Sequence, residues 1–299
     1  MKITVVGAGK VGSTVTQLLA MAALGEVVLV NRTAEKAQGI ALDLQESGVD
    51  VQVTGTGRYQ QTAGSDLMII TAGLPRKEGM SRDELLRANA GIVTDAAKQL
   101  ARHSPDAVMI VVTNPLDVMA AAAWKASHFP PKRVVGMAGA LDSSRFRSFI
   151  AQELGVSVRD VQALVLGSHG DLMVPLPRLT TVRGIPLPDL LPAKKIAQLV
   201  QRTVDAGAEI IALEKDSAFY APAAAVVEMV EAILLDRKRI VPCSTLLRGE
   251  FGIKGVFLGV PVVLGHGGVE RIVDPGLTVG EKRELQAAGR KVAAMAKGV

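Results

Sequence analysis

Apolar runs and amphipathic segments alternate along the first half of the chain. Continuous apolar runs, typical of buried strands, lie at residues 2–6, 26–30, 66–71 and 107–112. Segments with helical periodicity lie between them, at residues 13–23, 34–45 and 83–102. Strands that alternate with helices predict βαβ units, which form a parallel sheet with right-handed crossovers.

The pattern changes after about Met137. Helical periodicity recurs at residues 143–154, 193–213, 222–235 and 281–297, whereas strand patterns lie at residues 161–166 and 257–264. We find no repeat, low-complexity tract or obvious linker, which favours two closely packed lobes. The sequence therefore predicts an α/β fold with a Rossmann-type doubly wound parallel sheet in residues 1–138. An α+β substrate and catalytic domain follows in residues 139–299.

The composition is that of a globular protein with an aliphatic core. Hydrophobic residues make up 48% of the 299 positions and aromatic residues only 3%, so aliphatic side chains and methionine must fill the core. The net charge of +5 could favour an anionic ligand, but excess basic residues also commonly coat soluble surfaces. No basic cluster is interleaved with aromatic residues, which argues against a nucleic-acid partner.

Cysteine usage and hydropathy indicate a cytoplasmic protein. Cys243 is the only cysteine, so no intrachain disulfide can form, and a reducing compartment is the natural expectation. No window holds 18 uninterrupted apolar residues, and glycines break the apolar N-terminus as they would after a first strand. We therefore expect no membrane partner, and no residue pattern indicates a metal site.

A glycine motif follows the first predicted strand. Gly7, Gly9 and Gly12 form G-x-G-x-x-G between a strand and a helix, where backbone N–H groups and the helix dipole can hold a diphosphate. A glycine-rich turn that serves packing alone is the alternative. The motif predicts a dinucleotide site formed by Gly7, Ala8, Gly9, Lys10, Val11 and Gly12.

The second predicted strand ends without the acidic residue that usually binds the adenosine ribose. Asn31 and Arg32 stand there instead. A carboxylate would repel a 2′-phosphate, whereas Arg32 can pair with one, so the sequence predicts a preference for NADP, with NAD possible as the cofactor. In the alternative interpretation Arg32 points to water and Asn31 bonds an unmodified ribose.

Charged residues follow the predicted strand ends, where ligands bind to doubly wound sheets. The loop after residues 66–71 carries Arg76 and Arg82. Asp142 and Arg145 are three residues apart, so they share one face of a helix, and His169 lies in the segment LGSHGDLMVP. Each has an inert explanation when taken singly: a solvated arginine, a surface ion pair or a structural loop histidine.

Taken together, the motifs GAGKVG, TAGLPRKEGMSR, VTNPLD, GMAGALDSSRFR and LGSHGD occur in an order that overturns the inert explanations. With them the sequence resembles the lactate/malate dehydrogenase family over nearly its whole length. It is most similar to the bacterial malate dehydrogenases of lactate-dehydrogenase-like type. The other three histidines lie outside these motifs and are interpreted as structural.

The resemblance implies roles for four residues. His169 corresponds to the general acid/base of the family, and Asp142 to the aspartate that orients it. Arg82 would polarise the C2 carbonyl of the substrate, and Arg145 would grip its C1 carboxylate through a bidentate fork.

The resemblance also implies contacts for the cofactor and for the remainder of the substrate. Val112, Thr113 and Asn114 would lie along the nicotinamide, Asn114 would also bond the substrate oxygen, and Asn89 matches a position near the cofactor. Arg76 takes the position at which family members carry arginine for dicarboxylates and glutamine for lactate. A less secure match places Ala218 where the second carboxylate needs room.

The implied activity is reversible hydride transfer between a nicotinamide cofactor and malate or oxaloacetate, in a homodimer or homotetramer. A lactate or other 2-hydroxyacid dehydrogenase is the first alternative, and Arg76 argues against it. An NAD-dependent glycosidase is a remote alternative, because it would need a metal held by Cys and His, and Cys243 has no neighbouring histidine. A non-catalytic cofactor sensor would have no use for the set of His169, Asp142 and arginines.

Overall fold

The computed structural model describes residues 1–74 and 81–298, and at Arg82 the backbone alone. A single eleven-stranded sheet has the order β3-β2-β1-β4-β5-β6-β12-β13-β8-β9, with β14 paired to β13. Its first six strands are parallel and have the doubly wound order that the sequence predicted. They are β1 (Lys2–Val6), β2 (Glu26–Val30), β3 (Val53–Thr56), β4 (Leu67–Ile70), β5 (Val108–Val111) and β6 (Val134–Gly136).

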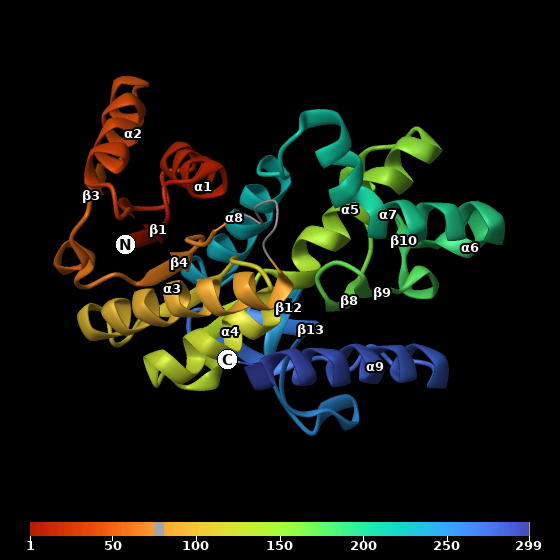
Figure 1. Cartoon of the computed structure of the whole chain (residues 1–299). Coiled ribbons are helices and arrows are strands. Elements are labelled where there is room, and N and C mark those ends of the chain that lie inside the picture. Colours follow the sequence, from red (N-terminus) through yellow and green to blue (C-terminus); the bar gives the residue numbers. More distant parts are fainter. Residues whose placement is uncertain (75–80, 299) are drawn as a thin grey trace.

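Helices cover both faces of this parallel part. The connecting helices are α1 (Lys10–Met21), α2 (Ala34–Glu46), α3 (Arg82–His103) and α4 (Leu116–Ser127). Helices α3 and α4 pack against each other on one face, while α1 packs against α8 on the opposite face (Figure 1). The strand order reverses between β1 and β4, so a crevice opens at the carboxyl ends of these two strands.

The second half of the chain extends the same sheet with antiparallel strands. Ser244 of β12 pairs with Gly136 of β6, which carries the sheet from one half of the chain into the other. The main strands here are β8 (Val165–Ser168), β9 (Leu172–Pro175), β12 (Arg239–Arg248), β13 (Lys254–Gly265) and β14 (Gly268–Ile272). The helices are α5 (Ala138–Leu154), α6 (Leu187–Leu190), α7 (Ala193–Glu214), α8 (Tyr220–Leu234) and α9 (Val279–Met295). A separate three-stranded sheet contains β7 (Val161–Gln162), β10 (Thr181–Val182) and β11 (Ile185–Pro186).

Two element predictions were wrong in this half. The strand expected over residues 161–166 is two short strands, β7 and β8, which belong to different sheets. Helix α5 begins at Ala138, before the expected residue 143, and its N-cap Met137 makes no side-chain cap. The start of α5 therefore lacks the Ser, Thr, Asp or Asn N-cap that usually marks the beginning of a helix in a sequence. Across the whole chain, the described strands and α-helices that were not predicted at all are β3, β6, β9, β10, β11, β12, β14, α4 and α6.

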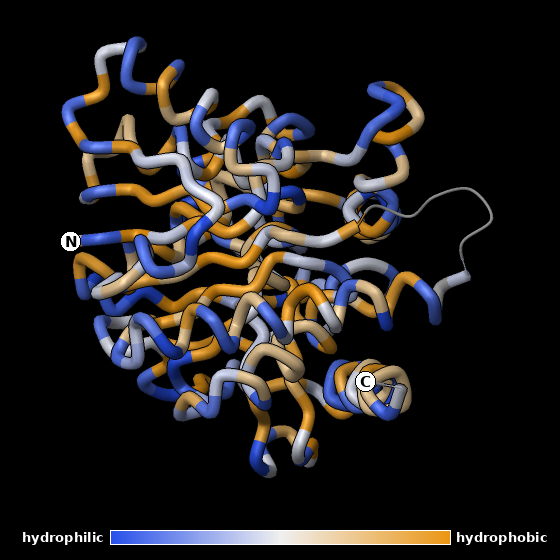
Figure 2. Tube along the Cα trace, turned by 60° about the vertical axis from the view of Figure 1, so that its left-hand side comes forward, coloured by the Kyte–Doolittle hydropathy of each residue, from blue (hydrophilic) through white to orange (hydrophobic). Residues whose placement is uncertain are grey.

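The core is aliphatic and continuous across both halves. Strands β4 and β5 are buried at every position, as the apolar runs predicted. One apolar cluster includes Ile69 from the first half together with Val260 and Leu285 from the second. Figure 2 shows the central strands in the colour of apolar residues, with polar residues mainly outside. A division of the chain at 138/139 remains a prediction, because the sheet and the core both cross it.

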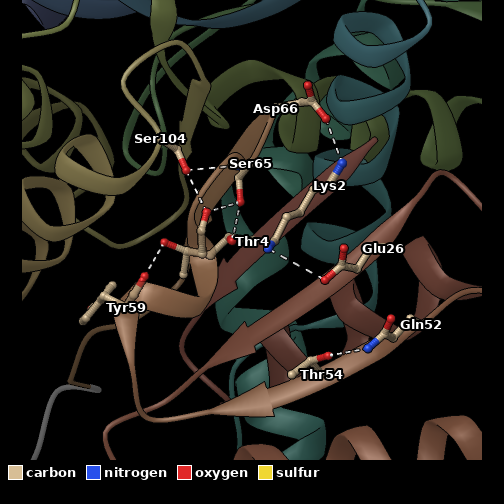
Figure 3. A network of polar contacts seen from close by, with 10 residues as sticks. Lys2, Thr4, Glu26, Gln52, Thr54, Tyr59, Ser65, Asp66 and Ser104 are labelled. Carbon is tan, nitrogen blue, oxygen red and sulfur yellow. Dashed lines mark hydrogen bonds and ion pairs between the residues drawn. The ribbon is translucent and has the colours of Figure 1, made fainter.

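Polar contacts close the edge of the sheet opposite the crevice (Figure 3). The hydroxyls of Thr4 and Ser65 lie 2.8 Å apart, and the backbone N–H of Ser65 donates to Ser104 Oγ at 3.0 Å. The backbone N–H of Lys2 donates to Asp66 at 2.7 Å. The bonds of Thr4, Ser65 and Ser104 satisfy buried polar groups near the amino-terminal ends of β1 and β4. Among the described residues, no helix combines the length and apolar character needed to cross a membrane.

Candidate active site

The glycine turn after β1 leaves no room for a side chain at Gly7 or Gly12. Gly7 has a φ of +107°, a conformation that residues with a Cβ rarely adopt. A Cβ on Gly12 would lie only 1.8 Å from the Gly7 carbonyl oxygen, so no larger residue fits there. A Cβ on Gly9 would meet nothing within 4 Å, and α1 begins at the next residue without a side-chain cap. The turn therefore offers open space beside a helix N-terminus, which suits a diphosphate.

Asn31 braces this turn. Its Oδ1 accepts a hydrogen bond from the Ala8 backbone N–H at 3.1 Å, and its Nδ2 donates to the Thr33 carbonyl at 3.0 Å. This bracing role was missed from the sequence, where Asn31 was considered only as a partner of the ribose. The neighbouring Arg32 is exposed beside the turn.

Lys10 links the glycine turn to the second half of the chain. Its ammonium group lies 2.5 Å from the Asp216 carboxylate and 5.4 Å from the centre of the Phe219 ring. Both members of the ion pair are about half exposed, so the pair contributes little to stability. Its structural effect is to join the turn to the segment before α8.

Asn89 fixes the strand ends on the other side of the crevice. The Asn89 side chain is buried, its Oδ1 accepts from the Leu74 N–H at 2.7 Å, and its Nδ2 donates to the Asn114 carbonyl at 2.9 Å. Thr113 Oγ1 donates to the Ala72 carbonyl at 2.7 Å. Asn89 and Thr113 thus hold the ends of β4 and β5 together, and their side chains are occupied by the protein itself.

A capping box lies at the beginning of α3. Ser81 Oγ accepts from the Glu84 N–H at 3.2 Å, and the Ser81 N–H donates to the Glu84 carboxylate at 2.9 Å. Arg82 is the first residue of the helix, and its side chain lies outside the described structure. Arg76 also lies outside the described residues, so its role and that of Arg82 stay predictions.

The partly buried His169 pairs with the buried Asp142. The imidazole Nδ1 lies 3.0 Å from each oxygen of the Asp142 carboxylate, which is only 1% exposed. Burial lowers the pKa of His169, but the charge and hydrogen bond of Asp142 outweigh it and raise that pKa above its ordinary value of 6.5. With Nδ1 held by the carboxylate, Nε2 is the nitrogen that can exchange a proton with a ligand.

Helix α5 packs directly on β8 to bring the pair together. A Cβ on Gly139 would lie 2.1 Å from the Val165 carbonyl oxygen, so glycine allows the helix and strand to touch. Ser143 Oγ accepts from the Val165 N–H at 2.9 Å. Asp142 lies between these two contacts, and the following strand residues carry His169 to it.

Arg145 is a mostly buried cation beside this pair. Its side chain is 10% exposed, and a guanidinium nitrogen lies 3.6 Å from Asp142, one helical turn away. Burial lowers the pKa of Arg145, while the charge of Asp142 raises it. Among the described residues, the buried Arg145 Nε has no hydrogen-bond partner. A buried guanidinium with unused donors suits a carboxylate ligand.

His169 and Arg145 line one cavity of about 300 Å³ between the two halves of the chain. Apolar side chains, including Met137 and Leu141, line much of its wall. Among the residues predicted from the sequence, those that line it are Val11, Val112, Asn114, Arg145, His169 and Ala218. An imidazole, a guanidinium group and Val11 of the helix after the glycine turn therefore line one space, as in a small-molecule site.

Comparison with known proteins agrees with this architecture. The family model described as lactate/malate dehydrogenase, NAD binding domain, matches residues 1–136. The model described as lactate/malate dehydrogenase, alpha/beta C-terminal domain, matches residues 139–297. The chain belongs to the lactate/malate dehydrogenase family. It is therefore an oxidoreductase with a site for a nicotinamide cofactor, on a fold that matches the predicted class.

Individual relatives are similar over nearly their whole length. The malate dehydrogenase of Thermomicrobium roseum is 54% identical over 295 residues, with 97% of this chain and 96% of the relative covered. The solved malate dehydrogenase of Salinibacter ruber has a TM-score of 0.96 at 51% identity and covers 100% of this chain and 97% of its own. A minor L-lactate dehydrogenase of Enterococcus mundtii has a TM-score of 0.95 at 32% identity, covering 100% and 98%. The fold alone does not distinguish the two substrates.

Gly9 and Gly12 should respond differently to substitution. Gly12→Ala forces a Cβ against the Gly7 carbonyl and should destabilise the protein by about 1–3 kcal/mol or more. Gly9→Ala meets open space and should leave the melting temperature of the ligand-free protein unchanged, while it weakens cofactor binding. Thermal unfolding and a fluorescence titration with NADPH measure the two effects. Equal melting temperatures for the two variants would contradict this account of the turn.

Proposed function

We propose that the protein catalyses reversible hydride transfer between NADP(H) and the pair malate/oxaloacetate. The observation that carries the proposal is that His169 and Arg145 line one cavity together with Val11 of the helix after the glycine turn, while the buried Asp142 holds His169 from behind. Relatives at 54% identity that are named malate dehydrogenase support the same activity.

The residues of the chain have complementary roles in the proposed reaction. The nicotinamide cofactor, when bound, supplies or accepts the hydride. In reduction, His169 gives a proton to the C2 oxygen of the substrate, and in oxidation it takes the proton back. Asp142 stabilises the imidazolium form of His169, and Arg145, which lines the cavity, binds the C1 carboxylate. Arg82 polarises the C2 carbonyl.

The remaining contacts position the ligands. Asn114 follows β5 at the wall of the cavity, where it bonds the substrate oxygen, and Val112 packs beside the nicotinamide. Asn89 and Thr113 support this wall from behind, through the bonds described above. The apolar wall keeps water away from the reacting carbon, which strengthens every charge interaction in the cavity.

The proposal also covers location, oligomeric state and partners. We propose that the chain acts in the cytoplasm as a homodimer or homotetramer with no nucleic-acid or membrane partner. Large apolar residues are exposed on α1 and α7, such as Met21 at 67% and Leu213 at 77%, which supports an interface with a second copy. Lactate dehydrogenase activity is the second candidate, because an enzyme of that name shares the fold.

Replacement of His169 by asparagine tests the general acid/base. Asparagine has no group that can carry the proton at neutral pH, so kcat should fall by about 10²–10⁴. The dissociation constant of NADPH should stay the same, because the glycine turn is untouched. Stopped-flow turnover and a binding titration give the two numbers. Near-normal turnover in His169→Asn would refute the assignment.

Arg76→Gln tests the choice between dicarboxylate and monocarboxylate substrates. Pyruvate would leave Arg76 unpaired in a closed site at a cost of about 3–5 kcal/mol, so the ratio of kcat/KM for oxaloacetate to that for pyruvate should fall by about two to four decades. Lys77→Gln removes the neighbouring charge and serves as the matched control. If both variants change the ratio equally, Arg76 does not select the substrate.

A steady-state comparison of NADPH with NADH tests the cofactor. Arg32 is exposed next to Asn31, and a charge-assisted bond from it to a 2′-phosphate should favour NADPH by about one to two decades in kcat/KM. Arg32→Ala should remove this advantage without lowering the value for NADH, and the distant exposed Lys98→Ala should change neither. A clear advantage for NADH in the unaltered protein would overturn the NADP preference and leave the dehydrogenase activity standing.

A further inference from the structure

Residues 215–219 join α7 to α8 and form part of the wall of the active-site cavity. Ser217 and Ala218 of this segment line the same cavity as His169. Within the described parts of the chain, no backbone N–H of residues 216–218 donates to another backbone group. The position of this wall therefore depends on side-chain contacts rather than on the bonds of a helix or a sheet.

The Asp216 carboxylate connects this wall to the glycine turn. Its Oδ2 lies 2.5 Å from the Lys10 ammonium, and its Oδ1 accepts a hydrogen bond of 2.7 Å from the Ser217 N–H. One carboxylate thus links the first residue of α1 to the backbone of a residue that lines the cavity. The hydrogen bond between Lys10 and Asp216 raises the pKa of Lys10 and lowers that of Asp216, so both groups are charged at neutral pH.

The Phe219 ring adds a second contact between the turn and the wall. The Lys10 ammonium lies 5.4 Å from the centre of this ring, within the range of a cation–π interaction. The Tyr220 ring packs against Phe219, with 4.1 Å between the ring centres, and helix α1 packs on α8 beside them. Lys10 therefore contacts the segment at both of its ends, at Asp216 and at Phe219.

An ion pair that is half exposed changes an equilibrium only about two- to fivefold. Such an effect is too small to decide whether the chain folds. It is large enough to change how often a short segment without backbone bonds occupies one position, and a substrate that contacts the segment then binds more weakly.

We propose that Asp216 is a positioning residue for the substrate, which holds the Ser217–Ala218 wall of the cavity against the cofactor turn through Lys10. Asp216 itself touches no reacting atom in this role. The effect on the substrate rests on the function proposed above, whereas the effect on the position of the wall does not.

Backbone order parameters from ¹⁵N NMR relaxation of the ligand-free, full-length protein test the proposal without any turnover. Asp216→Asn keeps an oxygen that can accept from the Ser217 N–H and removes the charge that Lys10 binds. The order parameters of residues 216–219 should fall from about 0.85, typical of rigid backbone, towards about 0.6.

Glu209→Gln is the matched control for this measurement. Glu209 pairs with Arg202 at 2.9 Å on α7, and both side chains are about half exposed, as in the pair of Lys10 with Asp216. The control makes the same change from carboxylate to amide away from the cavity wall. It should leave the order parameters of residues 216–219 unchanged.

Steady-state kinetics at saturating NADPH tests the effect on the substrate. KM for oxaloacetate should rise about two- to fivefold in Asp216→Asn, because the substrate must then order the wall on binding. The value of kcat should stay the same, because the pair of His169 and Asp142 is untouched. A merely structural defect would lower kcat through loss of folded protein and leave KM in place, and Glu209→Gln should change neither.

Lys10→Gln removes the other member of the ion pair. Because Lys10 lies in the predicted cofactor turn, this variant should also bind NADPH more weakly, so the cofactor is kept saturating. KM for oxaloacetate should rise by the same factor as in Asp216→Asn, and it should rise no further in the double variant. If the two single effects multiply in the double variant, Asp216 does not act through Lys10 and the proposal is overturned.

The outcomes separate the two proposals. Unchanged order parameters of residues 216–219 in Asp216→Asn, or an unchanged KM for oxaloacetate, overturn the role of Asp216. Lack of turnover with malate and oxaloacetate in the unaltered protein overturns the proposed function, and the order parameters of the ligand-free protein still decide whether Asp216 holds the wall.

Discussion

The direct contact between helix α5 and strand β8 determines the chemistry of this protein. Gly139 lets the helix backbone approach the Val165 carbonyl, and Ser143 bonds the N–H of the same residue. Between these contacts, the Asp142 carboxylate lies 3.0 Å from His169 Nδ1. A methyl group at residue 139 would push α5 away from β8 and move the Asp142 carboxylate away from the His169 imidazole. The hydrogen bond and charge interaction of this pair therefore depend on the close packing of helix and strand.

The sheet places the cofactor side of the site against this pair. Asn114 follows the parallel strand β5 and the glycine turn follows β1, whereas His169 follows the antiparallel strand β8. Pairing of Ser244 with Gly136 makes both sets parts of one sheet, so the cavity between the halves has walls that share a single core. Ser244 also donates a hydrogen bond to Asp117 of α4, which ties that helix to the junction of the halves.

Periodicity in the sequence predicted strands β1, β2, β4 and β5 and helices α1, α2 and α3 of the parallel half, and the motifs contain residues that line the cavity. They failed where tertiary contacts decide the outcome. The run 161–166 contains enough β-branched and apolar residues for one strand, but two different sheets compete for its ends. The first turn of α5 has no cap, and its small residues are explained only by the strand that they touch. Asp117 stood inside a quoted motif, yet its burial and its single hydroxyl partner could not be read from neighbouring residues.

Asn89 and the Ser81–Glu84 capping box have a consequence for the evolution of substrate choice. They anchor the chain at Leu74 and at Ser81, on either side of residues 75–80. Neither anchor uses a side chain of residues 75–80, because the bonds of Asn89 go to the backbone of Leu74 and Asn114 and the capping box closes between Ser81 and Glu84. With Arg76 in the selective role proposed above, descendants of this scaffold could change their substrate by exchanging these six residues while they inherit both anchors unchanged.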